Sequence, residues 1–270
     1  MLSDYFNKGV GMKKILSALI VLSLVLAAGN GFAKDWKKIR VGVEGAYPPF
    51  SFLTPDQKLD GFDIDMAKAI VAAAGGEIEL VISDWDGIIP GLLAKKFDCI
   101  VASMSITEER KKAVAFTNKY YQTPAKFVVK KGAIKEFSKE AIKGKSVGVQ
   151  RATIHDQYLT DNYGKDVEVK RYGTQDEVYL DIAAGRIDMF LADIIAAKEG
   201  FIEKPEGKDF QFIGPDLTDV KWFGEGAGIA CRKEDKDLIK KLNDAIQKIR
   251  KDGTYKKIQD KYFDFDIYGK

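Results

Sequence analysis

The chain has 270 residues, of which 46% are hydrophobic, and carries 43 Lys and Arg against 40 Asp and Glu. This composition is typical of a globular protein and excludes a disordered chain, a collagen and a disulfide mini-scaffold. A formal charge of +3 is too small for the basic surface that nucleic-acid binding needs, so no nucleic-acid partner is expected. One His and two distant Cys cannot build a His/Cys zinc cluster, and no metal or other cofactor is expected.

The most apolar run of the chain lies near its N-terminus, where residues 15–28 (ILSALIVLSLVLAA) follow a Met-Lys-Lys start at 12–14. This run is shorter than the roughly 20 residues of a membrane-spanning helix. Gly31 and Ala33 are small residues at the positions that a signal peptidase reads. The pattern predicts a signal peptide, 1–33, cleaved after Ala33, with 1–11 as an N-terminal extension; an uncleaved anchor is the alternative.

Export leaves the state of the two cysteines open. Cys99 and Cys231 both fall in apolar, strand-like stretches, 97–102 and 228–232. An oxidising compartment permits one disulfide. A buried free thiol that acts as a small hydrophobic group is an equal alternative.

From Trp36 onward, short β-rich runs alternate with amphipathic helical runs, which is typical of parallel α/β units. The patterns predict strands at 39–43, 77–82, 97–102 and 126–130, and helices at 62–74, 85–96, from about 107, and over most of 234–268. Two segments also repeat: VGVE at 41–44 resembles VGVQ at 147–150, and AKKFD at 94–98 resembles AGRID at 184–188. Two similar α/β lobes are therefore expected, with chance similarity as the alternative.

Common catalytic motifs are absent from the sequence: there is no G-x-S-x-G elbow, P-loop, G-x-G-x-x-G or H-E-x-x-H. The single His, His155, has no marked nucleophile near it, so a position at the surface or at the rim of a site is expected.

Four segments carry a binding signal, and the first two belong to the first half of the chain. Residues 44–50 (EGAYPPF) follow the first strand, where open α/β sheets place their ligand loops, and present Glu44 beside Tyr47. Residues 102–110 (ASMSITEER) join a strand end to a helix start that carries Arg110. Helix-start amides and a guanidinium suit a carboxylate. A capped helix with a solvated Arg110 is the alternative.

The other two segments follow strands of the second half. Gln150, Thr153 and His155 lie in the turn at 150–155, where Thr153 is expected to serve mainly as a helix N-cap. Asp193 follows an apolar, strand-like run. It either caps the next helix or holds an ammonium group across a cleft.

The chain from about 39 to 268 resembles the type II periplasmic amino-acid-binding proteins of ABC importers, especially the lysine/arginine/ornithine- and histidine-binding group. The resemblance rests on GFDID at 61–65, SITEER at 105–110, AGRID at 184–188, DGTY at 252–255 and KYFDFD at 261–266. It implies an α/β, two-lobed type II fold with a two-crossing hinge and a central ligand cleft. Lobe 1 would comprise 34–123 plus 227–270, and lobe 2 would comprise 124–226.

By matching positions, the resemblance also implies roles for individual residues. Arg110 would hold the ligand α-carboxylate with help from Ser105 and the Thr153 segment, and Asp193 would pair with the α-ammonium. Ser103 would add a polar contact, Tyr47 and Trp85 would flank the ligand side chain, and Glu44 would lie at its far end. Met104, Gln150 and His155 complete the expected site.

A carboxylate and aromatic faces both attract a cationic side chain, so the expected ligand is arginine, lysine or ornithine, with histidine as a further candidate. The protein is then a monomeric periplasmic binding protein, not an enzyme, that delivers its ligand to an ABC permease. The alternatives are an enzyme similar to the periplasmic cyclohexadienyl dehydratases and a sensory or chemotaxis protein. The chain departs from the family pattern at Ala102 and at 152–155 (ATIH), where the family often has Ser and Gly-Thr-Thr-Gln.

Overall fold

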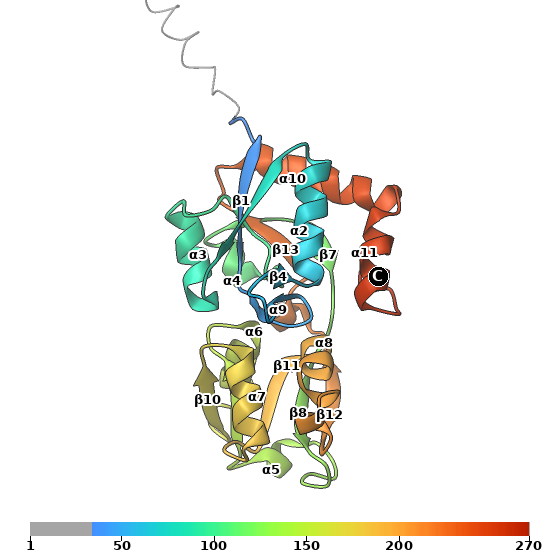
Figure 1. The fold of residues 1–270 in the computed structure, drawn as a ribbon. Helices are drawn as coiled ribbons and strands as arrows, with labels where there is room; N and C mark the ends of the chain where they lie inside the picture. The colour runs from blue at the N-terminus through green and yellow to red at the C-terminus, as the bar shows by residue number, and fades with distance from the viewer. Residues whose placement is uncertain (1–33, 270) are drawn as a thin grey trace, which may run out of the picture. The chain divides into compact units, whose positions relative to one another are not determined.

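A computed structural model describes residues 34–269, and its ribbon is drawn in Figure 1. The signal peptide and its cleavage after Ala33 lie outside the described residues and stay predictions. Within the described range, every helix is too short or too polar to cross a membrane. Two five-stranded sheets organise this part of the chain, and each forms the centre of one lobe.

The first sheet has the strand order β5-β1-β6-β13-β7. Strand β1 pairs in parallel with β5 and β6, whereas β13 runs antiparallel to β6 and β7. The strands are β1 (Lys38–Val43), β5 (Glu77–Ile82), β6 (Cys99–Ile100), β7 (Ala115–Tyr121) and β13 (Ala227–Cys231). Strand β13 therefore returns from far along the sequence into the interior of a sheet that earlier residues began.

Helices cover both faces of the first sheet. Alternating residues of β6 and β13 separate two apolar clusters: Cys99 and Cys231 pack with α2 and α10, while Ile100 and Ala230 pack with α3. The helices of this lobe are α2 (Phe62–Ala73), α3 (Trp85–Leu93), α4 (Glu108–Lys111), α10 (Lys236–Lys251) and α11 (Thr254–Tyr262). A small sheet of β2 (Ala46–Tyr47), β3 (Ser51–Leu53) and β4 (Leu59–Asp60) follows β1.

The second sheet has the order β10-β9-β11-β8-β12. Its strands are β8 (Ala125–Lys130), β9 (Ser146–Gln150), β10 (Glu168–Tyr172), β11 (Met189–Asp193) and β12 (Phe210–Leu217). Its helices are α5 (Lys139–Ile142), α6 (Ile154–Tyr163), α7 (Gln175–Ala183), α8 (Ile194–Ala197) and α9 (Val220–Phe223). Residues of α5 and α6 pack in one apolar cluster and residues of α7 in another, so this lobe also has helices on two faces.

The repeated segments of the sequence occupy equivalent positions in the two sheets. Strands β1 and β9 each lie second from the edge beside a parallel neighbour. Asp98, which ends the first AKKFD segment, accepts a hydrogen bond from the backbone N–H of Arg40 in β1 at 3.1 Å. Asp188 accepts the same bond from Ser146 in β9 at 2.8 Å. The two lobes thus share one α/β plan, in which the repeated segments hold equivalent places.

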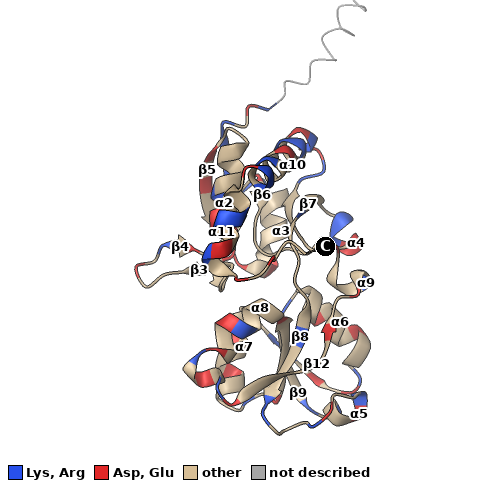
Figure 2. Cartoon of the chain, turned by 90° about the vertical axis from the view of Figure 1, so that its right-hand side faces the viewer, with Lys and Arg blue, Asp and Glu red and all other residues tan. Residues whose placement is uncertain are grey.

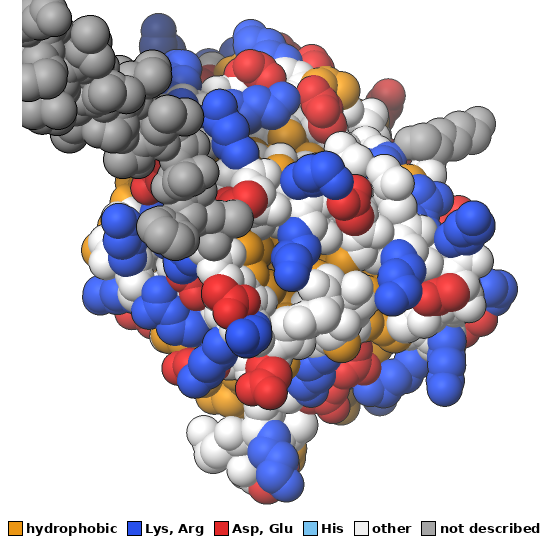
Figure 3. All heavy atoms as spheres, turned by 90° about the horizontal axis from the view of Figure 1, so that it is seen from above, with side chains coloured by type: hydrophobic (Ala, Val, Ile, Leu, Met, Phe, Trp, Pro, Cys, Tyr) orange, Lys and Arg blue, Asp and Glu red, His pale blue; other side chains and the backbone are white. Residues whose placement is uncertain are grey.

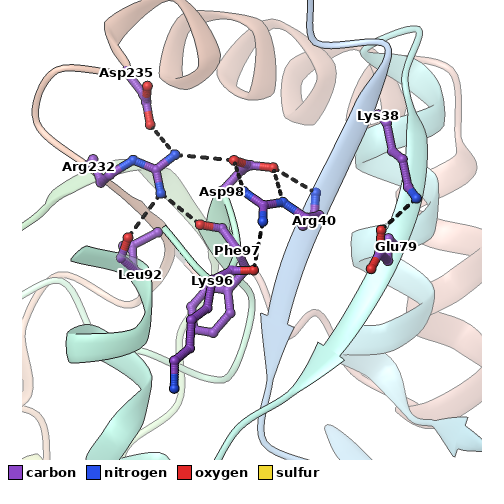
Figure 4. Close-up of polar contacts among 9 residues, drawn as sticks. All are labelled: Lys38, Arg40, Glu79, Leu92, Lys96, Phe97, Asp98, Arg232 and Asp235. Carbon is purple, nitrogen blue, oxygen red and sulfur yellow. Dashed lines mark hydrogen bonds and ion pairs between the residues drawn. The ribbon is translucent and has the colours of Figure 1, made fainter. Parts of the chain in front are cut away.

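A buried ion cluster joins the returning strand to the rest of the first lobe (Figure 4). The side chain of Arg232, directly after β13, is 3% exposed and donates to the carbonyl oxygens of Leu92 at 3.0 Å and Phe97 at 2.7 Å. The same guanidinium lies 3.3 Å from Asp98 and 2.6 Å from Asp235. The ion pairs and hydrogen bonds of Arg232 offset the cost of burying its charge, and they hold β13 against α3 and β6.

Most predicted elements are present, with two differences of length. The helix expected to reach residue 96 ends at Leu93, because Lys95 takes a positive φ of 60° and turns the chain. The strand expected over 97–102 pairs only at Cys99–Ile100, since its last residues leave the sheet to form a turn. The expected helix near Thr107 is the four-residue α4, and the C-terminal region forms α10 and α11.

Most charged side chains lie on the outer surfaces of these layers. Figure 2 shows Lys, Arg, Asp and Glu along α10, α11 and α7, while strands β8 and β9 are mainly uncharged. On the face seen in Figure 3, acidic and basic side chains are interspersed. This distribution agrees with the small net charge of the chain.

Candidate functional site

A cavity of about 550 Å³ lies between the two lobes. Ten of the eleven side chains expected in the site line it: Glu44, Tyr47, Trp85, Ser103, Ser105, Arg110, Gln150, Thr153, His155 and Asp193. The cavity is also lined by residues 121–125, at the first crossing between the lobes, and by Thr218, Phe223 and Gly224, at the second. The structure therefore brings together side chains from both halves of the sequence.

Arg110 provides a cation without a counter-charge. Thr107 caps α4 by accepting the backbone N–H of Arg110 at 3.3 Å. The guanidinium donates from Nη1 to the Ser105 carbonyl at 3.1 Å and lies 5.2 Å from the centre of the Trp85 ring. Among the described residues no carboxylate pairs with it, and burial lowers its pKa to about 10. The remaining N–H groups are donors for an anion that enters the cavity.

Asp193 provides the opposite charge from the second lobe, and it combines two roles. Its Oδ1 accepts the backbone N–H groups of Ile195 at 2.8 Å and Ala196 at 3.2 Å, which caps α8. Its Oδ2 accepts the Thr123 hydroxyl and belongs to a side chain that lines the cavity. Burial raises the pKa of Asp193 to about 6. The carboxylate is thus a helix cap that also presents negative charge to the cavity.

Glu44 is the second buried acidic side chain that lines the cavity. Its Oε1 accepts a hydrogen bond from Nε2 of Gln150 at 2.5 Å, across the two lobes. Burial raises the pKa of Glu44 to about 7, and the charges of Asp176, Asp84 and Asp86 raise it further against the effect of Gln150. A cationic group beside Glu44 would relieve this electrostatic cost.

The loop after β6 places its residues on alternate sides. Ser103 lines the cavity, but its N–H and Oγ both donate to Oδ2 of the buried Asp63, at 2.6 and 3.0 Å. Ser103 has a positive φ of 51°, and the two hydrogen bonds to Asp63 hold the backbone in this conformation. Met104 points the other way and is fully buried in the α3 cluster, so its expected place in the site is wrong. Ser105 contributes through its carbonyl, which holds Arg110.

The turn between β9 and α6 forms the opposite wall. Thr153 is the N-cap of α6, as expected: its Oγ1 accepts the Asp156 N–H at 3.2 Å and donates to the Gln150 carbonyl at 2.7 Å. His155 lines the cavity with a buried side chain beside Phe223. Burial, and then the charge of Arg110, lower the pKa of His155 to about 3. Its imidazole is therefore neutral near pH 7.

Comparisons with known proteins agree with this architecture. Residues 39–265 match the family model of the bacterial extracellular solute-binding proteins, family 3. The chain belongs to this family. It is 48% identical to the L-arginine-binding protein of Pseudomonas aeruginosa, over 96% of this chain and 99% of that protein. It is 41% identical to the histidine-binding periplasmic protein of Escherichia coli, over 96% and 100% of the two chains.

Among solved structures, an ancestral arginine-binding protein bound to arginine is 39% identical to this family 3 protein. The two superpose with a TM-score of 0.78 over 84% of this chain and 98% of the other. The predicted two-lobed type II fold is confirmed by this likeness. These relatives are named as binding proteins, and the family is one of solute-binding proteins, which agrees with the expected binding role.

The two lobes of this solute-binding protein contact each other along one side of the cavity. Nε1 of Trp85, at the start of α3, donates to the Ala152 carbonyl at 3.1 Å. Next to it, Asp86 forms an ion pair with Arg151, which lies in the turn between β9 and α6. Together with the Glu44–Gln150 bond, these contacts join the end of β1 and the start of α3 to one turn of the second lobe. These contacts therefore form one wall of the cavity between the lobes.

Sequence reasoning missed two groups of functional residues. Thr123, Thr218 and Phe223 line the cavity from the crossings, where the sequence has no periodic pattern to mark an inward side chain. Asp63 was part of the GFDID motif, but its role in holding Ser103 was not predicted. Its signal was a carboxylate between the apolar residues Phe62 and Ile64 at the start of α2, a position that requires hydrogen-bond partners when buried.

Proposed function

We propose that this protein captures a basic L-α-amino acid, arginine, lysine or ornithine, between its two lobes. The observation that carries the proposal is the pair formed by Arg110 of the first lobe and Asp193 of the second. Each is charged, lines the same cavity and has no ion-pair partner among the described residues. An α-amino acid supplies the missing carboxylate and ammonium together, so it bridges the lobes.

The acidic end of the cavity supports a cationic ligand side chain. Glu44 lies close enough to Asp84, Asp86 and Asp176 for their charges to raise its pKa, and neither a Lys nor an Arg compensates it in the described structure. Tyr47 and Trp85 add aromatic surface to the same cavity, which favours a guanidinium or ammonium group. The relatives named for arginine and for histidine agree with this class, with histidine as a weaker candidate.

The remaining site residues have supporting roles in this proposal. Ser105 accepts a hydrogen bond from Arg110, and Thr153 fixes the turn on the opposite side of the α-carboxylate. Gln150 orients Glu44. Ser103 shapes the floor through Asp63, and neutral His155 adds a polar edge beside Arg110. Each role follows from a contact of this chain.

We further propose that the protein is exported to the periplasm, cleaved after Ala33, monomeric, and a partner of an ABC permease. The lobe boundaries follow the two sheets: 34–123 plus 227–270 for lobe 1, and 124–226 for lobe 2. The apolar run at 15–28 and the family description support export. The position of β13 inside the first sheet supports the discontinuous first lobe.

Calorimetric titration of the protein tests this function. The protein is unfolded and refolded to remove carried-over ligand, and is then titrated with arginine, lysine, ornithine, histidine and glutamine. We expect a Kd of about 1 μM or tighter, a binding free energy near −8 kcal/mol, for at least one of the first three. Heat with glutamine alone would refute the basic class, and no heat with any of them would refute amino-acid binding.

A further inference from the structure

The two cysteines of the chain lie directly opposite each other in the first sheet. Cys99 of β6 pairs with Cys231 of β13 in an antiparallel register, beside the pair formed by Ile100 and Ala230. Directly opposed residues of antiparallel strands have Cα atoms about 4.5 to 5.5 Å apart. This separation lies inside the range of about 4.4 to 6.8 Å that a disulfide spans.

Both thiols also point to the same side of the sheet. Cys99 and Cys231 belong to the apolar cluster that α2 and α10 cover, whereas Ile100 and Ala230 belong to the cluster on the other face. The neighbouring Cys99 thiol and burial together raise the pKa of Cys231. The sulfur atoms are therefore already neighbours and need no change of backbone pairing to meet.

We propose that Cys99 and Cys231 form a disulfide bond across β6 and β13 while the exported chain folds. This inference rests on the proposed export, because a periplasmic location supplies the oxidant. It does not depend on which ligand the cavity takes.

The oxidant is a disulfide of a thiol–disulfide carrier protein. One cysteine thiolate attacks a sulfur of the carrier disulfide, which gives a mixed disulfide and releases one carrier thiolate. The second cysteine thiolate then attacks the sulfur of the first cysteine, which releases the carrier's second thiolate. Two cysteine thiols become one disulfide, and one carrier disulfide becomes two thiols, so electrons and protons balance.

The reaction belongs to folding and not to the finished protein. In the folded structure Cys99 is 1% exposed and Cys231 is fully buried. A raised thiol pKa and full burial both suppress attack on an external disulfide. Exchange with the carrier therefore takes place before α2 and α10 cover this face, and the bond is afterwards protected from reductant.

Such a bond would connect two strands whose ends reach the ligand cavity. Strand β6 leads into the loop of Ser103 and Ser105, and β13 begins at Ala227, which lines the cavity. The bond closes a covalent loop that contains the whole second lobe. Because the sulfur atoms lie on the α2 and α10 face, the bond stabilises the first lobe without contributing a group to the cavity.

Intact mass analysis tests the bond. Protein secreted with its own signal sequence is denatured in guanidinium chloride and treated with iodoacetamide, with and without prior reduction. We expect no carbamidomethyl groups without reduction and two after it. Two groups without reduction, or a bond between two chains, would overturn the proposal.

Two controls separate the outcomes. The chain from residue 34, made in the cytosol and refolded with glutathione disulfide, reports on bond formation independently of export. If it forms the bond while the full chain stays uncleaved and unsecreted, export fails and the cysteine geometry stands. Wild-type protein that has been unfolded, reduced and refolded in reductant should also unfold several degrees below the oxidised wild-type protein, whereas the same treatment should leave the unfolding temperature of the double variant C99A/C231A unchanged; equal responses would contradict the bond.

Discussion

Replacing Arg110 by Met tests the centre of the proposed site. The change keeps an unbranched apolar stem beside Trp85 but removes the guanidinium, which has one protein acceptor, the Ser105 carbonyl. A carboxylate held in bidentate fashion receives two hydrogen bonds, each contributing about 1.5 to 3 kcal/mol because both groups are charged. The loss is therefore about 3 to 6 kcal/mol, or roughly 10²- to 10⁴-fold in Kd. R110K keeps the positive charge but loses the two parallel donors of the guanidinium, so its Kd should lie between those of the wild-type protein and R110M.

A ligand without the carboxylate makes this prediction specific. Agmatine is arginine that lacks its α-carboxylate, so the wild-type protein should bind arginine more tightly than agmatine by a similar factor. In R110M the two ligands should bind almost equally, because the partner of the carboxylate is gone. Calorimetry on refolded, ligand-free protein measures all four affinities. A loss of less than fivefold in R110M, or an unchanged preference for arginine over agmatine, would refute the role of Arg110.

Three other residues give independent predictions. For Asp193, substitution by Asn should weaken binding of every α-amino acid at least tenfold, and an unchanged Kd in titration would mean that Asp193 acts only as the cap of α8. For Glu44, whose pKa is raised to about 7, a cationic ligand stabilises the carboxylate, so arginine should bind more tightly as the pH rises from 5 to 8 and release a proton near pH 6.5. Calorimetry in buffers of different ionisation enthalpy measures the number of protons released. Glutamine binding should release fewer protons than arginine binding, since only Asp193 then contributes. E44Q should remove this difference in proton release and should weaken the binding of arginine more than the binding of glutamine. For Arg232, substitution by Met removes the cation beside Asp235 and one of those beside Asp98, and should lower the free energy of unfolding by about 3 to 5 kcal/mol, whereas K233M next to it, on an exposed side chain, should change it by less than about 0.5 kcal/mol in urea denaturation.

The sequence predicts the regular elements well where one pattern decides them. Strand β5 has the predicted bounds, and α2 differs at one end by a residue, because their apolar spacing and the glycines after α2 leave few alternatives. Strand β6 is shorter than predicted because its apolar run continues into a turn whose direction depends on Asp63, a residue distant in sequence. Apolar character marks burial but does not distinguish a strand from a buried turn.

The candidate site shows the same division between local and distant information. Arg110 and Asp193 were predicted because Arg110 lies in the helix start that follows a strand end and Asp193 closes an apolar strand. Met104 was wrongly included because its neighbours Ser103 and Ser105 belong to the site, and only the turn shows that it faces the core. Phe223 was missed because its place depends on how the second crossing lies over α6.

The position of the second sheet along the chain has a consequence for inheritance and biosynthesis. Its first strand β8 and its last strand β12 are neighbours, and Ala125 pairs with Leu217, so the chain enters and leaves this lobe at one place. A segment with adjacent ends can be inserted, exchanged or circularly permuted without stretching the rest of the protein. Recombination between related genes could therefore replace the half of the site that carries Asp193 while keeping the half that carries Arg110. During synthesis the second lobe can be completed before the first lobe, although its first residue is made later. The first sheet is completed only when β13 has been made.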